Sequence, residues 1–362
     1  MHRTPSRLAT SVLVAASIAR AAAVAGPAAA DAQATPTSTP KPQTITLVTH
    51  DSFAVSTDVL AAFTRRTGIT VKVLQVGDAG QVVNQAILTK DNPLGDVLFG
   101  VDNTFLTRAL GEGIFERYRS PALADVAPDL QLDPKDRVTP IDYGDVCINY
   151  DKDWFASHDL AVPKTLADLT KPKYRDLLVV EDPSTSSPGL AFLLATVSQF
   201  GESGWTKYWE QLRANGVRTV DGWEQAYYDE FTGGGAGGER PLVVSYASSP
   251  AAAVVFADPP IDASPVGTMT ASCFRQVEFA GILAGTEHRA AARELVDFLL
   301  SDAFQSDVPL QMFVYPARTG TALPKVFTEN ADAVADPYTM APTRIGAHRE
   351  EWVREWTGVV LR

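Results

Sequence analysis

The sequence contains little cysteine and little histidine, with two and five residues of each in a chain of 362. Neither residue type occurs with the Cys-x-x-Cys or His-x-x-His spacing that is typical of metal ligands, and the histidines do not cluster. The chain also has no Ser-His-Asp arrangement and no nucleophile elbow. These absences argue against a structural zinc site and against a serine hydrolase.

Positive charge is also scarce, because 31 Lys and Arg face 43 Asp and Glu, which gives a formal net charge of −12. No Lys/Arg-rich run is present, so the sequence does not indicate binding to nucleic acid. The acidic balance is compatible with a cationic ligand. A hydrophobic fraction of 45% and a charged fraction of 20% are ordinary for a soluble globular protein.

The N-terminus has the pattern of an export signal. Two arginines precede an Ala-rich apolar stretch, residues 8–30, which Arg20 and Pro27 interrupt, and small-residue cleavage sites follow. We predict a signal peptide over 1–34, a Pro/Thr-rich linker over 35–43, and a mature protein in the periplasmic or extracellular cell-envelope space. No cysteine lies near the cleavage region, so lipid attachment to an N-terminal cysteine is not available.

The two cysteines, Cys147 and Cys273, are far apart in the sequence. In an exported protein an isolated pair suggests one disulfide. The alternative is that Cys147 is a free, reactive thiol, which would need a nearby base.

The first part of the mature chain alternates between strand and helix patterns. Helical spacing of apolar residues lies between β-branched, alternating runs. The pattern predicts a parallel α/β sheet, and the loops after its strands lie at the edge where such sheets bind ligands. The expected strands are 44–49, 69–76 and 96–99, the helices 57–67 and 81–90, and the loops 50–53, 78–80 and 100–103.

A length of 362 residues suits two lobes better than one ordinary domain. A strand over 146–150, entered through Gly144, is the expected crossing into the second lobe, and a strand over 276–283 is the expected return. We therefore predict one discontinuous lobe, residues 44–142 plus 276–362, and a second lobe, residues 143–275.

Of three other segments, the first has two interpretations and the other two have a structural interpretation. The hydroxyl-rich run 183–189 opens a helix over 190–200, which suits either an anion site or a plain N-cap. The glycines of 233–238 lack the Lys-Ser/Thr ending of a phosphate loop, so a surface insertion is expected. In the C-terminal helix, Trp352 and Trp356 share one face, which predicts packing.

The stretch around Trp223, Tyr227 and Tyr246 is rich in aromatic side chains. Flat apolar faces with polar edges hold a flat cation well. The other interpretation is core packing, because most aromatic residues of a large chain are buried.

Seven segments in order make the chain resemble the substrate-binding proteins of thiamine ABC transporters, within a wider group that includes ferric-ion and polyamine binders. The resemblance covers most of residues 44–360. The segments are Thr49-His50-Asp51-Ser52-Phe53, Gly100-Val101-Asp102-Asn103, Asp142-Tyr143-Gly144, Asp182-Pro183-Ser184-Thr185-Ser186-Ser187-Pro188-Gly189-Leu190, Gly222-Trp223-Glu224-Gln225-Ala226-Tyr227, Ser245-Tyr246-Ala247-Ser248-Ser249-Pro250 and Tyr315-Pro316.

The resemblance implies a two-lobed type II periplasmic binding protein fold, with a hinge and a ligand cleft between the lobes. It implies a monomer that captures thiamine or its phosphate esters for the permease and ATPase subunits of an ABC importer. His50 stands where the family has an aromatic residue. The ligand-binding residues that it implies are His50, Asp78, Ala79, Asp102, Ser186, Ser187, Trp223, Tyr227, Tyr246, Ala247, Ser248 and Ser249.

Two alternatives remain from the sequence. Tyr227 and Tyr228, with His50 and Asp51, could form a ferric-ion site, or the same cleft could take a polyamine. An enzyme similar to thiaminase I would use Cys147 as its nucleophile. We expect a binding protein without a cofactor rather than an enzyme.

Overall fold

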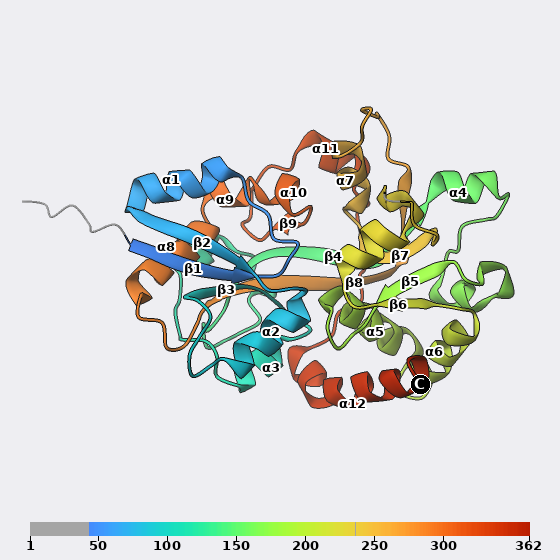
Figure 1. The fold of residues 1–362 in the computed structure, drawn as a ribbon, viewed down its shortest axis with the longest axis horizontal. Helices are drawn as coiled ribbons and strands as arrows, with labels where there is room; N and C mark the ends of the chain where they lie inside the picture. The colour runs from blue at the N-terminus through green and yellow to red at the C-terminus, as the bar shows by residue number, and fades with distance from the viewer. Residues whose placement is uncertain (1–42, 236) are drawn as a thin grey trace, which may run out of the picture. The chain divides into compact units, whose positions relative to one another are not determined.

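The computed structural model describes residues 43–235 and 237–362. The strands in these residues form a single sheet (Figure 1). The α/β prediction is therefore confirmed. The strands within these residues are β1 (Gln43–Thr49), β2 (Ile69–Gln75), β3 (Val97–Asp102), β4 (Thr139–Asp151), β5 (Leu178–Glu181), β6 (Arg218–Val220), β7 (Leu242–Tyr246), β8 (Val266–Ile282) and β9 (Tyr315–Pro316).

Twelve α-helices are found in the same described residues. They are α1 (Thr57–Thr67), α2 (Ala79–Leu88), α3 (Leu106–Gly111), α4 (Lys152–Ser157), α5 (Ser187–Phe200), α6 (Trp205–Ala214), α7 (Ser249–Val255), α8 (Arg289–Leu299), α9 (Asp302–Gln305), α10 (Val308–Gln311), α11 (Lys325–Asn330) and α12 (Pro342–Val360). The predicted signal peptide and almost all of the predicted linker lie outside the described residues. No helix within those residues is both long and apolar enough to cross a membrane.

The sheet has the strand order β2-β1-β3-β8-β4-β7-β5-β6, and β9 pairs with β4. Pairing is parallel among β2, β1 and β3 and among β7, β5 and β6, whereas β8 and β4 pair with their neighbours antiparallel. Strands β3 and β5 are buried along their whole length, as their apolar sequences require. Edge strand β2 alternates instead and turns Lys72 outward.

The two long central strands connect the parallel parts of the sheet. The expected strand over 276–283 is only the second half of β8, which has 17 residues, and the expected strand over 146–150 is the second half of β4. A disulfide between Cys147 and Cys273 joins these two strands. The lobe boundaries at 142 and 275 stay a prediction.

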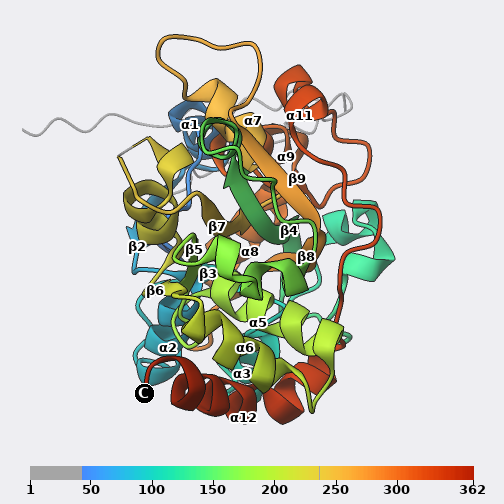
Figure 2. The ribbon, with the colours of Figure 1, turned by 90° about the vertical axis from the view of Figure 1, so that its right-hand side faces the viewer.

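Helix α12 packs on α6 and α3, and Figure 2 shows it passing along one side of both. Trp352 and Trp356 are buried, and the Trp356 ring lies 5.5 Å from the ring of Trp209 on α6. The predicted packing role of the two tryptophans is therefore confirmed. These rings are remote from the strand ends described next, which position the site.

Candidate ligand-binding site

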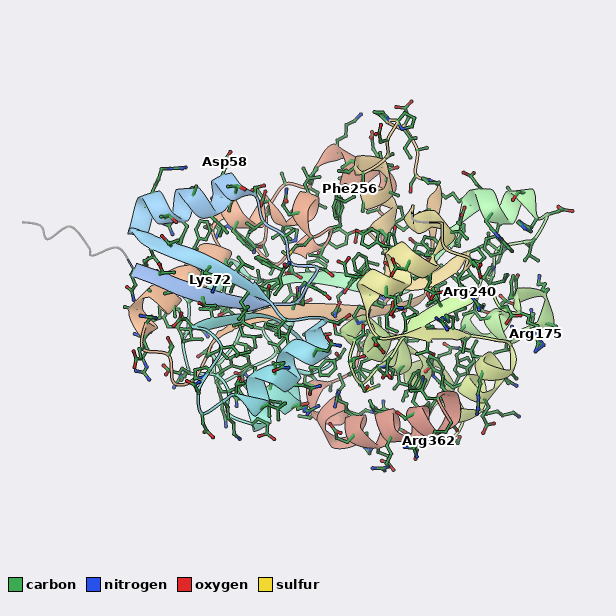
Figure 3. The ribbon with its side chains drawn as sticks, in the orientation of Figure 1. Asp58, Lys72, Arg175, Arg240, Phe256 and Arg362 are labelled. Atoms are coloured by element: carbon green, nitrogen blue, oxygen red, sulfur yellow. A yellow bond between two sulfur atoms is a disulfide. The ribbon has the colours of Figure 1, made fainter. Side chains whose placement is uncertain are left out.

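A cavity of about 830 Å³ lies where the segments after β1, β2, β6 and β7 meet. This volume is within the range of small-molecule sites. The cavity forms here because the carboxyl ends of parallel strands release their chains at the same edge of a sheet. Phe256, labelled in Figure 3, also lines the cavity and is 66% exposed.

Most of the residues that the sequence assigns to the site border this cavity. They come from the loop after β1, the start of α2, the start of α5, the segment after β6 and the end of β7. These residues are His50, Asp78, Ala79, Ser187, Trp223, Tyr227, Tyr246 and Ser249.

Asp102 and Ser186 do not border the cavity, and their contact with a ligand stays a prediction. Asp102 is buried, and its carboxylate accepts hydrogen bonds from the Thr104 hydroxyl and from the Gln276 amide, both at 2.7 Å. Ser186 is the N-cap of α5 and is also buried. Its hydroxyl serves the helix, as the N-cap interpretation of this run predicted.

Ala247 and Ser248 do not border the cavity either, and their contact with a ligand likewise stays a prediction. Ala247 is buried against Cys147 and Cys273. The buried Ser248 hydroxyl donates to the backbone oxygen of Phe313. Both residues follow directly after β7, where only one side of the chain faces the cavity.

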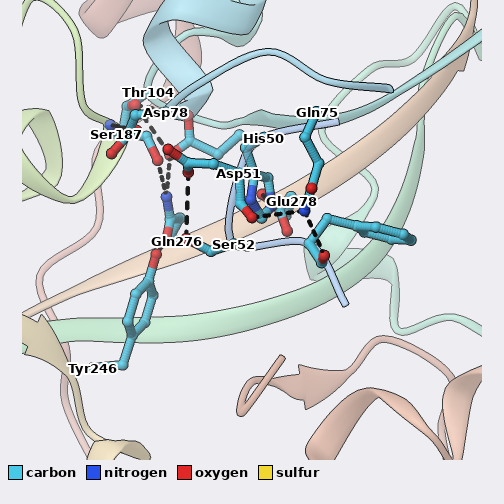
Figure 4. Close-up of polar contacts among 12 residues, drawn as sticks. His50, Asp51, Ser52, Gln75, Asp78, Thr104, Ser187, Tyr246, Gln276 and Glu278 are labelled. Carbon is cyan, nitrogen blue, oxygen red and sulfur yellow. Dashed lines mark hydrogen bonds and ion pairs between the residues drawn. The ribbon is translucent and has the colours of Figure 1, made fainter. Parts of the chain in front are cut away.

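His50 and Glu278 form a pair on the cavity wall, with 3.2 Å between Nε2 and Oε1 (Figure 4). The imidazole packs against Phe99 and over Gly100, where a Cβ atom would lie 2.5 Å from the ring. Burial acts to lower the pKa of His50, but Glu278, Asp78 and other carboxylates outweigh it, and the net shift is upward. The pair therefore favours a protonated imidazole.

Asp78 connects two separate segments across the cavity. Its carboxylate accepts from the backbone N–H of Ser187 at 3.2 Å and from that of Trp223 at 3.0 Å. Burial raises the pKa of Asp78, while the Trp223 hydrogen bond acts against this shift. Asp78 thus holds the start of α2 against the start of α5 and against the aromatic segment.

Further carboxylates face the same space. The Ser52 hydroxyl donates to Glu224 at 2.9 Å, and burial raises the pKa of Glu224. Asp51 and Asp258 also line the cavity, and none of the described lining residues is Lys or Arg. The wall is therefore suited to a cationic ligand.

Another part of the lining is aromatic. The Trp223 ring stacks on Tyr227 with centroids 5.2 Å apart and an angle of 23°, and Tyr228 and Tyr246 lie edge-on to it. The indole N–H donates to the Ser245 hydroxyl at 2.9 Å, which fixes the orientation of Trp223. These rings offer flat faces for a flat cation.

A buried hydrogen-bond network supports this wall from behind (Figure 4). The Tyr246 hydroxyl donates to Gln276 at 2.7 Å, and the Gln276 amide donates to Ser187 and to Asp102. Burial raises the pKa of Asp102 to about 7. Gly144 allows Tyr246 to lie close, because a Cβ atom there would be 2.9 Å from its ring.

The sequence did not identify several cavity residues. Glu278 lies in a predicted strand, and its polar side chain among apolar neighbours is the signal that could have indicated it. The glycines predicted as a surface insertion also partly line the cavity, through Gly233, Gly234 and Gly235, which the sequence did not indicate. Glu224 and Phe313 were also missed as lining residues, and Tyr228 was named only for the alternative ferric-ion site.

The cysteines do not form a nucleophilic site. Cys147 and Cys273 are both buried and joined in the disulfide, so neither has a free thiol. Among the described residues, no group of three or more His, Cys, Asp and Glu is placed to hold a metal ion. Burial also raises the pKa of Tyr227, which disfavours the tyrosinate that a ferric ion requires.

The strand-edge cavity, lined by carboxylates and aromatic rings, defines a small-molecule binding protein. Residues 92–336 match the family described as bacterial extracellular solute-binding protein, and the chain belongs to this family. It is therefore an exported solute-binding protein of an ABC transporter, with the mixed α/β periplasmic binding protein fold, and not an enzyme.

Individual relatives agree with this assignment. The chain is 29% identical over 326 residues to a thiamine-binding periplasmic protein of Escherichia coli strain K12. This match covers 88% of this chain and 94% of that protein. A solved periplasmic thiamin binding protein matches with a TM-score of 0.78 and 27% identity, over 88% of this chain and 96% of that one. Iron uptake protein A1 of Synechocystis sp. PCC 6803 is 23% identical over 295 residues, 78% of each chain.

Proposed function

We propose that the protein binds thiamine and delivers it to an ABC importer made of permease and ATPase subunits. The observation that carries the proposal is a cavity lined by carboxylates and by stacked aromatic rings, without Lys or Arg among its described lining residues. The names of the relatives from Escherichia coli and of the solved thiamin binding protein support the same ligand.

The chemistry of thiamine fits this lining. Its thiazolium ring carries a permanent positive charge, and its aminopyrimidine ring is flat and donates hydrogen bonds. Trp223 and Tyr246 would stack on the rings. Asp78 or Glu278 would offset the charge or accept from the amino group. Since no described lining residue is Lys or Arg, the lining favours the cationic thiazolium of thiamine over the phosphate group of a thiamine phosphate ester.

Titration calorimetry of the mature chain with thiamine tests the proposal, with tryptophan fluorescence read in parallel. We expect one-to-one binding and quenching, because Trp223 lies at the cavity. Thiamine that gives neither heat nor quenching would overturn the proposal. Fe(III) and a polyamine would then be titrated in the same way.

A further inference from the structure

The His50–Glu278 pair is the feature of the cavity whose role the proposed function leaves open. Both side chains are mostly buried, with exposed fractions of 13% and 14%, yet both reach the cavity surface. His50 is the one basic side chain among the described lining residues. A cationic ligand that approaches Glu278 therefore meets an imidazole that already occupies this carboxylate.

We propose that Glu278 receives the positively charged part of the ligand and that ligand capture expels the proton of His50. This inference rests on the proposed function, because it takes thiamine as the cation. The exchange is balanced: the imidazolium loses its proton to solvent, the ligand cation replaces it beside Glu278, and no covalent bond to the ligand changes.

The surroundings of His50 determine which proton moves. Asp51 lies on the same loop, Asp78 lies at the start of α2 and Glu278 lies on β8, and all three stabilise the imidazolium. From the segment after β6, the Glu224 carboxyl also interacts with His50. Strand β3 contributes Phe99 and Gly100, neither of which titrates.

Glu278 also has a carboxyl neighbour on the strand beside it. Asp142 on β4 is its cross-strand partner and is 2% exposed. Burial and the neighbouring Glu278 raise the pKa of Asp142 well above its usual value, which favours the protonated form of Asp142. Glu278 can then pair with either His50 or the ligand, but two cations on one carboxylate repel each other.

Competition for one carboxylate links binding to pH. Between pH 6 and pH 8, the affinity for thiamine should increase by about tenfold, since one linked proton can change affinity by at most about tenfold per pH unit. The affinity increases with pH because the protonated form of His50 opposes the ligand cation.

Calorimetry of thiamine binding at pH 6.5, in two buffers with different ionisation enthalpies, counts the protons released. We expect a release of up to about one proton from the unmodified protein and much less from His50→Gln. His288→Gln is the matched control, because His288 pairs with Asp96 at 3.0 Å and does not line the cavity. This variant should release protons as the unmodified protein does.

Each result has a defined meaning. Tight thiamine binding without proton release, or release that persists in His50→Gln, would overturn the inference and leave the proposed function intact. Absence of thiamine binding at every pH would overturn the proposed function itself.

If thiamine does not bind, the interaction between His50 and Glu278 can still be tested without ligand. The imidazole pKa of His50, followed by NMR, should decrease in Glu278→Gln because the neighbouring negative charge is lost. An unchanged pKa would show that the two side chains are not coupled, and would overturn the inference.

Discussion

The two walls of the cavity differ in how they can recognise a ligand. The carboxylate wall, built after β1 and β2 and from β8, carries His50, Asp51, Asp78 and Glu278. The aromatic wall, built after β6 and β7, carries the rings around Trp223 together with one carboxylate, Glu224. Charge acts over several ångströms and tolerates small shifts, but stacking requires contact between faces. The comparison teaches that affinity should depend most on the aromatic wall, and charge selection on the carboxylate wall.

The largest expected effect is therefore on the aromatic wall. Trp223→Ala should weaken thiamine binding about 100-fold, because stacking and the cation–π interaction together contribute about 2–3 kcal/mol in a desolvated site. Calorimetry measures the loss, and Trp223→Phe, which keeps a flat face, should recover part of it.

Trp154→Ala is the matched control for this prediction. Trp154 stacks on His158 with centroids 3.9 Å apart and does not line the cavity. Its replacement should leave affinity unchanged. Equal losses in both variants would show that the effect comes from general destabilisation, and an unchanged affinity in Trp223→Ala would remove the aromatic wall from recognition.

The next effect concerns the carboxylate wall. Asp78→Asn removes a negative charge but keeps an oxygen for the N–H of Ser187 or of Trp223. We expect affinity for thiamine to decrease about tenfold, because a hydrogen bond or pairing with a charged group contributes about 1.5 kcal/mol. Asp58→Asn on the exposed face of α1 (Figure 3) should have no effect. If both variants bind equally well, charge at Asp78 plays no part.

The two walls also differ in how well the sequence predicts them. Trp223, Tyr227 and Tyr246 lie in short segments with an aromatic signature, so the sequence could assign them directly. The carboxylate wall depends on pairing between distant strands. Glu278 reaches the cavity because β8 pairs with both β3 and β4, and strand register is a tertiary property that local sequence does not define.

The same reason explains why some assigned residues lie away from the cavity. The alternation of strands and helices over residues 44–103 predicted a parallel sheet, because local periodicity is sufficient for this. Ala247 and Ser248 were assigned with Tyr246 and Ser249 as one run. The turn after β7 directs the two inner residues to the disulfide and to Phe313, which only the folded structure shows.

The network behind the two walls should have a smaller effect on affinity and a clear effect on stability. Burial raises the pKa of Asp102 to about 7, above its value of about 3.9 in an unfolded chain. The folded protein then binds more protons than the unfolded chain between these values. The free energy of unfolding should therefore decrease as the pH rises from about 4 to about 7.

Asp102→Asn cannot bind this proton, so its stability should vary less over the same pH range. Denaturant unfolding at several pH values measures the difference. Affinity for thiamine should decrease about three- to fivefold, because Gln276 loses a charged acceptor and holds Tyr246 less firmly. A stability profile as steep as that of the unmodified protein would show that Asp102 is ionised throughout.

The smallest expected effect comes from a change of ligand, which leaves the contacts with the aromatic wall the same and alters the charge that the carboxylate wall meets. Thiamine monophosphate presents the same rings to the aromatic wall but adds negative charge near carboxylates, and no described lining residue is Lys or Arg. Screened repulsion of about 0.5 kcal/mol should make the monophosphate bind about two- to threefold more weakly than thiamine in parallel titrations.

Ser187→Ala should weaken both ligands equally, because the Ser187 hydroxyl accepts from Gln276. If the monophosphate binds more tightly, and Ser187→Ala removes that advantage, the start of α5 is a phosphate site and the carboxylate wall does not decide charge selection.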